Sequence, residues 1–263
     1  MITSASNSKL KLVRSLTGRT KERREAGAFV AEGVRLVEEA LASDWPFRFV
    51  LHAGEPRPRA KELIALLQQR GIEVEEISGK LLASLSETES SQGILAVLSD
   101  EKPQPMRALN FVLVTDGIRD PGNLGTLMRA AEAAGFEAVF MTPGTTDAFA
   151  PKVVRAGMGA HFRLPLYEIG WDEIRTQAGA YGWKVYLADM RGKSCWEVEF
   201  RPPLALIVGG EAEGAGGEAR RLATQTVSVP MQGRAESLNA AVAGAVLMFE
   251  TARQAGRAAR KAE

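Results

Sequence analysis

Residues 227–250 read Val227-Ser-Val-Pro-Met-Gln-Gly-Arg-Ala-Glu-Ser-Leu-Asn-Ala-Ala-Val-Ala-Gly-Ala-Val-Leu-Met-Phe-Glu250, a short apolar strand, a polar turn and a long apolar segment. Pro230 has no amide hydrogen and should end the strand, and Gly233 permits a tight turn. The segment predicts a helix opening at Glu236 and Ser237. Its apolar face, spaced close to i, i+4, comprises Leu238, Val242, Val246 and Phe249. This pattern alone is equally typical of an ordinary core unit and of a ligand site.

Polar residues at the start of this helix favour the ligand site. Ser237 and Asn239 lie where the first helical N–H groups lack intrahelical acceptors, which suits a charged small molecule. Upstream, residues 111–115 and 204–208 are apolar strands typical of a sheet buried on both faces. Strands alternating with helices through residues 110–263 predict an α/β domain with a mostly parallel sheet.

Two further polar stretches follow strands of this sheet. Asn123 is expected to cap a helix over residues 124–134, and Arg129 should project from its second turn. Gly209, Gly210 and Glu211 follow strand 204–208, at the end of the strand where parallel sheets bind ligands. An exposed arginine and a glycine-bearing strand–helix turn are the purely structural alternatives.

Taken together, the three stretches resemble the motifs of the SpoU family, RNA ribose 2′-O-methyltransferases of the SPOUT superfamily. Motif one matches Asn123-Leu-Gly-Thr-Leu-Met-Arg129, motif two matches Gly209 to Gly214, and motif three matches Pro230 to Asn239. Two departures affect side-chain contacts. The family often has Asn where this chain has Gly210, and its Asn-Val-Ser-Val-Ala reads Asn239-Ala-Ala-Val-Ala here.

The resemblance implies a trefoil-knotted domain that binds S-adenosylmethionine (SAM) and methylates a ribose 2′-hydroxyl of RNA. It implies an active site formed by Arg129, Asn123, Glu211, Ser237 and Asn239. The cofactor-binding residues it implies are Gly209, Gly210, Val229, Met231 and Leu238. A guanidinium stays protonated in proteins, so Arg129 is expected to hold a phosphate or the developing alkoxide rather than act as a base.

The N-terminal part of the chain predicts an RNA-binding domain. Residues 1–24 carry a charge of +6, whereas the whole chain has +1. The expected phosphate contacts are Lys9, Lys11, Arg14, Arg19, Lys21, Arg23 and Arg24. Residues 4–42 read as helical with a break near Gly27. Residues 29–40 and 91–97 resemble the small α/β substrate-binding domain of SpoU proteins, which is similar to ribosomal proteins of the L30e/L7Ae type. We therefore expect domains at 1–100 and 110–263, joined by a linker at 101–109.

Composition excludes several other classes. A single cysteine, Cys195, excludes an intrachain disulfide framework and suits the cytoplasm. That cysteine and two histidines, His52 and His161, have no ligand-like spacing, so no metal is expected. The sequence has no apolar run of the ~18–20 residues that a membrane span needs. The apolar last helix, rich in Ala and Gly, predicts a homodimer, as does the resemblance.

Several alternatives stay open at this stage. Ribosomal RNA, above all 23S, is favoured as the substrate because the two-domain layout resembles ribosomal-RNA members, and transfer RNA is the alternative. A catalytically inert RNA-binding protein with the same fold is a second alternative, and SAM binding would distinguish it. A phosphate-binding α/β enzyme acting on a nucleotide is a third, but the basic arm favours a macromolecular substrate.

Overall fold

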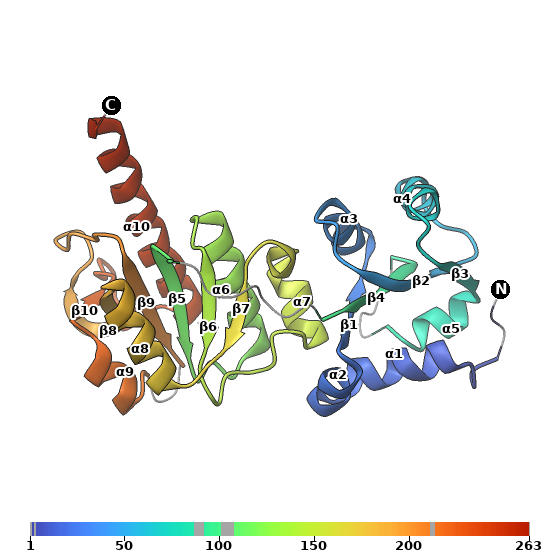
Figure 1. The fold of residues 1–263 in the computed structure, drawn as a ribbon, viewed down its shortest axis with the longest axis horizontal. Coiled ribbons are helices and arrows are strands. Elements are labelled where there is room, and N and C mark those ends of the chain that lie inside the picture. Colours follow the sequence, from blue (N-terminus) through green and yellow to red (C-terminus); the bar gives the residue numbers. More distant parts are fainter. Residues whose placement is uncertain (1, 3, 87–91, 101–107, 211–213, 263) are drawn as a thin grey trace. The chain divides into compact units, whose positions relative to one another are not determined.

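The computed structural model describes residues 2, 4–86, 92–100, 108–210 and 214–262, of which 257–262 by backbone alone. The chain forms two compact units, shown in Figure 1. Unit 1 comprises residues 1–102 and 147–162, and unit 2 comprises residues 103–146 and 163–263. The expected linker falls largely outside the described residues. The segment 147–162, expected in the second domain, packs in unit 1.

Unit 1 contains a four-stranded sheet in the order β1-β4-β2-β3. β4 pairs antiparallel with β1 and β2, and β2 pairs parallel with β3. The elements along the chain are α1 (Ser8–Gly18), α2 (Thr20–Ala26), β1 (Ala28–Glu32), α3 (Val34–Ala42), β2 (Phe47–Ala53), α4 (Pro58–Gln69), β3 (Val74–Ile77), α5 (Gly79–Ala83) and β4 (Ile94–Ser99), followed by α7 (Pro151–Gly157) and η1 (Ala160–Phe162). The prediction of a mainly helical segment 4–42 is therefore wrong at residues 28–32. These residues pair with β4, a partner too distant in sequence for a local pattern to reveal.

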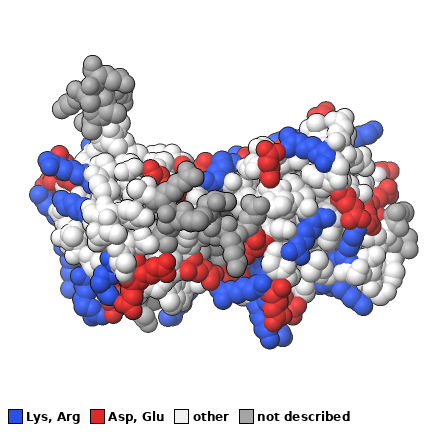
Figure 2. Space-filling view, in the orientation of Figure 1, with Lys and Arg blue, Asp and Glu red and all other residues white. Residues whose placement is uncertain are grey.

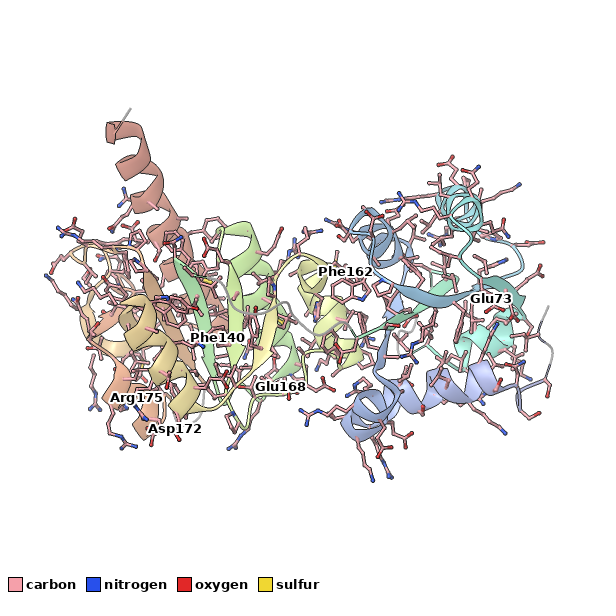
Figure 3. All side chains as sticks on the ribbon, in the orientation of Figure 1. Glu73, Phe140, Phe162, Glu168, Asp172 and Arg175 are labelled. Carbon is pink, nitrogen blue, oxygen red and sulfur yellow. The ribbon has the colours of Figure 1, made fainter. Side chains whose placement is uncertain are left out.

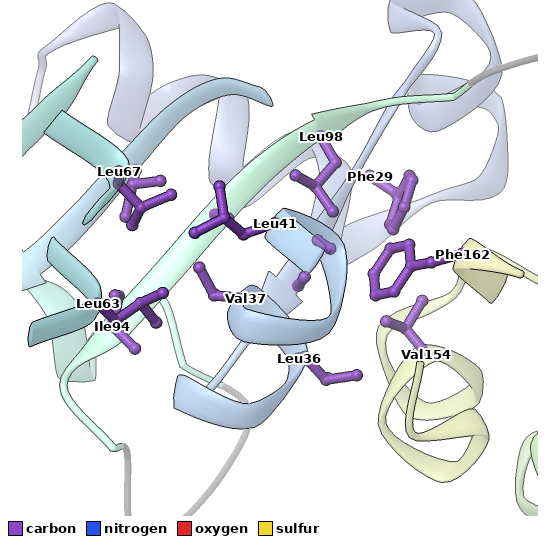
Figure 4. Packing of buried hydrophobic residues seen from close by; sticks show 14 of the residues in the cluster. Phe29, Leu36, Val37, Leu41, Leu63, Leu67, Ile94, Leu98, Val154 and Phe162 are labelled. Carbon is purple, nitrogen blue, oxygen red and sulfur yellow. The ribbon is translucent and has the colours of Figure 1, made fainter. Parts of the chain in front are cut away.

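Both faces of the unit 1 sheet are covered. On one face, α1 places Leu10, Val13 and Leu16 against β-strand residues such as Leu51 and Leu95. On the other face, one hydrophobic cluster contains residues of α3, of α4 and of the 147–162 segment, and Figure 4 shows Phe162 and Val154 close to Phe29. The ring centroids of Phe29 and Phe162 are 6.4 Å apart. The 147–162 segment therefore completes the hydrophobic core of unit 1.

An ion pair inside unit 1 also holds the start of the 147–162 segment in place. Arg23 of α2 is only 5% exposed, and its Nε donates to Asp147 Oδ2 at 2.7 Å. The Arg23 Nη1 donates to the carbonyl of Leu16 at 2.7 Å. A buried guanidinium needs such partners because burial of an unpaired charge is very costly.

Unit 2 is built on a six-stranded sheet in the order β10-β8-β9-β5-β6-β7, in which every neighbouring pair is parallel. Its elements are β5 (Phe111–Asp116), α6 (Pro121–Ala133), β6 (Ala138–Met141), β7 (Leu166–Glu168), α8 (Trp171–Tyr181), β8 (Lys184–Ser194), β9 (Leu204–Gly209), α9 (Gly217–Leu222), β10 (Gln225–Ser228) and α10 (Ala240–Ala262). The α/β class with a mostly parallel sheet is confirmed.

Helices cover both faces of this sheet, as parallel sheets require. α8 and α9 bury Ile174 and Ala219 against one face, on which Phe140, labelled in Figure 3, also lies. α6 and α10 cover the other face. A Cβ on Gly244 of α10 would lie 2.5 Å from Leu127 Cδ2 and 3.2 Å from Val208 Cγ2, so this glycine lets α10 approach α6 and β9 closely. Among the described residues, no helix is long and apolar enough to cross a bilayer.

Candidate cofactor and RNA site

A cavity of about 1120 Å³ lies in unit 2 beside the carboxyl-terminal parts of β8, β9 and β10. This is the edge at which open parallel sheets bind ligands. Most of its wall comes from four stretches of chain, which are Ala188 to Arg191, Val208 to Gly210, Thr226 to Met231 and Glu236 to Ala240. The five predicted cofactor residues Gly209, Gly210, Val229, Met231 and Leu238 all line it.

The glycines of motif two are required by close packing. A Cβ on Gly209 would lie 2.4 Å from the amide nitrogen of Ala215, and one on Gly210 would lie 2.9 Å from the Gly117 carbonyl oxygen. Both distances are too short for any side chain. The Gly210 amide donates to the Asp116 carbonyl at 3.1 Å, and the Gly216 amide donates to the Asp116 carboxylate at 2.7 Å. Asp116 thus anchors both ends of this loop. Glu211, predicted as catalytic, lies outside the described residues.

Motif three differs from the prediction in where its helix begins. α10 starts at Ala240, so Glu236 and Ser237 lie before the helix and not inside it. Asn239 is its cap, because its Oδ1 accepts hydrogen bonds from the amides of Ala241 at 3.0 Å and Val242 at 3.2 Å. The preceding residues are therefore free of helical geometry, and Ser237 and Leu238 line the cavity.

The helix that carries motif one begins about one turn earlier than expected. α6 starts at Pro121, and Asp120 caps it by accepting from the Asn123 amide at 2.8 Å. The prediction that Asn123 is the cap is therefore wrong, because a proline at the first helical position displaces the helix start. The Asn123 side chain instead accepts a hydrogen bond from Asn239 Nδ2 at 2.9 Å. Two predicted active-site residues are thus in direct contact.

Arg129 lies further along α6 and is exposed. No hydrogen bond or ion pair of its guanidinium is found with any residue that the structure describes. One turn later, Glu132 is paired with Arg163, whose Nε donates to it at 2.9 Å. An exposed, always charged fork on the helix that carries Asn123 suits an anionic group arriving from outside.

The predicted RNA-contacting cations fall into two groups. Lys11, Arg14, Arg19, Lys21 and Arg24 are exposed on α1, on α2 or between them. Lys9 pairs with Glu73 and Glu75 of unit 1. Arg23 is buried against Asp147, and this placement does not suit a phosphate contact. On the face that Figure 2 shows, Lys and Arg of this unit lie among carboxylates and form no single basic field.

The sequence reading missed one wall of the cavity. Ala188, Asp189, Met190 and Arg191 of β8 line it, as does Arg220 of α9. A signal was present, since Asp189 is an acidic residue directly after the apolar run of a parallel strand. Within the described part of the chain, no group of three or more His, Cys, Asp or Glu residues could hold a metal ion.

Comparison with known proteins identifies the class of protein that this fold and cavity define. Residues 110–249 match the SpoU rRNA Methylase family, and residues 7–96 match the MRM3-like substrate binding domain. The chain belongs to the SpoU rRNA methylase family.

Individual relatives cover nearly the whole chain. It is 37% identical, over 94% of its length and 97% of the relative's, to the Bacillus subtilis 23S rRNA (guanosine(2553)-2′-O)-methyltransferase RlmP. It is 30% identical, over 94% of its own length and 90% of the relative's, to the Streptomyces viridochromogenes 23S rRNA (uridine(2479)-2′-O)-methyltransferase. An AdoMet-bound rRNA methyltransferase from Sinorhizobium meliloti superimposes with a TM-score of 0.85 at 29% identity, covering 96% of this chain and 97% of that one.

Proposed function

We propose that this protein transfers the methyl group of SAM to a ribose 2′-hydroxyl of 23S ribosomal RNA. The observation that carries the proposal is the hydrogen bond between Asn123 and Asn239 at the edge of the sheet cavity, which brings motifs one and three of the family together. The two relatives named for 23S rRNA support the choice of RNA, because the alignments include both units of the chain.

The cavity fits SAM by size and chemistry. Val229, Met231 and Leu238 offer an apolar slot of the kind that an adenine ring occupies, and Gly209 and Gly210 bring backbone to the cavity wall, where it suits the polar edge of the ring. A Cβ on either glycine would collide with the neighbouring backbone, so both glycines are needed to pack this part of the cavity wall. SAM, when bound, supplies a methyl group on a positively charged sulfur.

The residues around the cavity have roles on the RNA side. A 2′-hydroxyl is a weak nucleophile and must lose its proton as it attacks, so its position and the charge that develops on it both matter. We assign Asn123, Ser237 and Asn239, with Glu211, to orienting the ribose. Arg129 holds a phosphate or the developing alkoxide through charge-assisted hydrogen bonds.

We also propose a homodimer formed through α10. Val242 and Phe249 on this helix are 46% and 52% exposed and lie nearly two helical turns apart on the same face. Gly244, one of the small residues of the helix from which the dimer was predicted, packs inward on Leu127 and Val208. An exposed apolar helix face needs a cover, and a second copy supplies an identical one. Sedimentation should show a dimer, and Phe249→Glu should give monomers.

The trefoil knot and the cytoplasmic location also belong to this proposal. α10 follows the edge strand β10 in sequence yet packs on α6 and β9 in the middle of the sheet, which is the path that a threaded C-terminal segment would take. A cytoplasmic location is supported by the single, buried Cys195 and by the nature of the substrate.

Mapping of 2′-O-methyl groups tests the substrate. RNA from cells with and without this protein should be digested and compared by mass spectrometry, separately for 23S rRNA, 16S rRNA and tRNA. One 2′-O-methyl nucleotide should disappear from 23S rRNA and return with the wild-type protein, but not with Arg129→Ala. A loss confined to tRNA would establish the alternative substrate. If no RNA loses a methyl group and the protein does not bind SAM, the inert alternative is supported.

A further inference from the structure

The wall of the cavity formed by residues 188–191 is held by a chain of hydrogen bonds. The Asp189 carboxylate accepts from the Arg191 amide at 2.9 Å and from Arg220 Nη1 at 2.7 Å. Arg220 Nε in turn donates to the carbonyl of Ala215 at 3.2 Å. Asp189, Arg191, Arg220 and Ala215 all line the cavity. One continuous network therefore joins the β8 wall to the glycine loop of motif two.

Beyond Asp189, a second anchor fixes the other end of the same wall. A Cβ on Gly192 would lie 2.5 Å from the Val227 nitrogen, so β8 and β10 touch backbone to backbone there. Ser228 Oγ also donates to the Gly192 carbonyl at 2.9 Å. The pairing register of β8 and β10 breaks in this region, between Thr226 and Val227. The wall thus leaves regular sheet geometry and depends on its anchors for its shape.

The charges in this network are matched. The Asp189 side chain is only 16% exposed, and a carboxylate so placed needs donors. The hydrogen bond from the Arg191 amide, and then Arg220, lower the pKa of Asp189, so the carboxylate is ionised at neutral pH. Met190, between the two anchors, is 73% exposed although it lines the cavity, so the wall itself has little hydrophobic packing to hold it.

We propose that Asp189 and Arg220 are positioning residues for the cofactor, which together hold the β8 wall against the motif-two loop. This inference rests on the proposed assignment of the cavity to SAM. It assigns neither residue to the reacting atoms. Removal of either one should loosen the same wall, so the two effects on cofactor affinity should not multiply.

Isothermal titration of the full-length protein with SAM and with S-adenosylhomocysteine tests this. Asp189→Ala and Arg220→Ala should each raise the Kd about tenfold, and the double variant should be no weaker than the weaker single one. Both ligands should be affected equally, because a wall does not sense the sulfonium charge. Affinity for RNA should stay unchanged, which a general folding defect would not allow. Asp189→Asn replaces Asp189→Ala if the latter does not fold.

A matched control lies on the same helix. Arg221 is the next residue of α9, pairs with Glu218 and does not line the cavity, so Arg221→Ala should bind SAM normally. A normal Kd for either Asp189→Ala or Arg220→Ala would overturn the proposal. A double variant whose loss of affinity equals the product of the two single losses would also overturn it, as would a loss of affinity for SAM but not for S-adenosylhomocysteine. Leu238→Asp distinguishes a failure of this proposal from a failure of the assignment of the cavity to SAM. If it too leaves SAM binding intact, the cavity is not the cofactor site.

Discussion

Asn239 donates a hydrogen bond from Nδ2 to Oδ1 of Asn123 at 2.9 Å, which joins two residues 116 positions apart in the chain. The same side chain accepts from the first amides of α10 through its oxygen. Asn239 therefore has both a structural and a site-forming contact, and the two use different atoms.

Substitutions of Asn239 should separate these contacts. Asn239→Asp keeps the capping oxygen but loses the donor to Asn123, whereas Asn239→Ala loses both. We expect only the Ala variant to lose stability, by about 1 kcal/mol, because a carboxylate caps as well as an amide. Both variants should methylate slowly. Urea unfolding and single-turnover assays measure the two quantities, and equal stabilities for both variants would contradict the capping role.

Replacement of Arg129 should change the chemical step more than binding. Lys keeps the charge but not the planar fork, so Arg129→Lys should bind SAM and RNA nearly normally and lose rate by about 10²–10³. Arg129→Ala should be slower still. Single-turnover methylation with saturating SAM and RNA measures this. Arg175→Lys is the control, since Arg175 pairs with Asp172 on the outer helix α8, where Figure 3 labels both. Near-normal rates for both Arg129 variants would remove this residue from the active site.

Exposed cations of α1 and α2 should set the salt dependence of RNA binding. Neutralising Arg19, Lys21 and Arg24 together should weaken binding and flatten the log–log salt slope by roughly 0.7–0.9 per lost phosphate contact. Lys61→Gln, on the exposed side of α4, is the matched control. An unchanged slope in the triple variant would mean that these cations only face solvent.

Arg23 should behave differently from its exposed neighbours. Arg23→Ala leaves Asp147 without its cation inside unit 1 and should cost about 3–5 kcal/mol of stability. Lys21→Ala, which removes an exposed partner of Glu25 at 3.6 Å, should cost less than about 1 kcal/mol. Thermal and denaturant unfolding compare the two. A stable Arg23→Ala protein with weakened RNA binding would restore Arg23 as a phosphate contact.

Acid should destabilise unit 1 through His161. Burial lowers the pKa of His161 to about 4, against an ordinary value of 6.5. Its Nε2 donates to the Ala148 carbonyl at 2.7 Å, and its Nδ1 has no partner among the described residues. The unfolded chain therefore binds a proton that the folded unit does not. Stability from this group is complete above about pH 6.5 and falls as pH drops toward 4, by up to about 1.4 kcal/mol per pH unit.

His161→Gln removes the titrating group while keeping a donor near the Ala148 carbonyl. Unfolding free energies of both proteins between pH 4 and 7.5 should converge as the pH falls. Parallel pH profiles would show that folding does not change the pKa of His161.

The sequence by itself determined what depends on neighbours along the chain. Apolar runs at 111–115 and 204–208 predicted buried parallel strands, and glycines 209 and 210 marked the loop that follows the second strand. These inferences held because strand patterning and backbone sterics act over a few residues. The order of the three motifs also indicated the SpoU family, since each motif keeps its spacing to the strand that it follows.

Only the tertiary structure decided which distant residues meet. Strand β1 exists because residues 28–32 pair with residues 95–99, and Arg23 is an interior residue because Asp147 lies against it. Asp189 and Arg220 likewise form their hydrogen bond only because folding brings β8 and α9 together at the cavity wall. Local pattern cannot reveal such pairs, because the free energy of burying a charge or pairing a strand depends on the partner that folding brings to it.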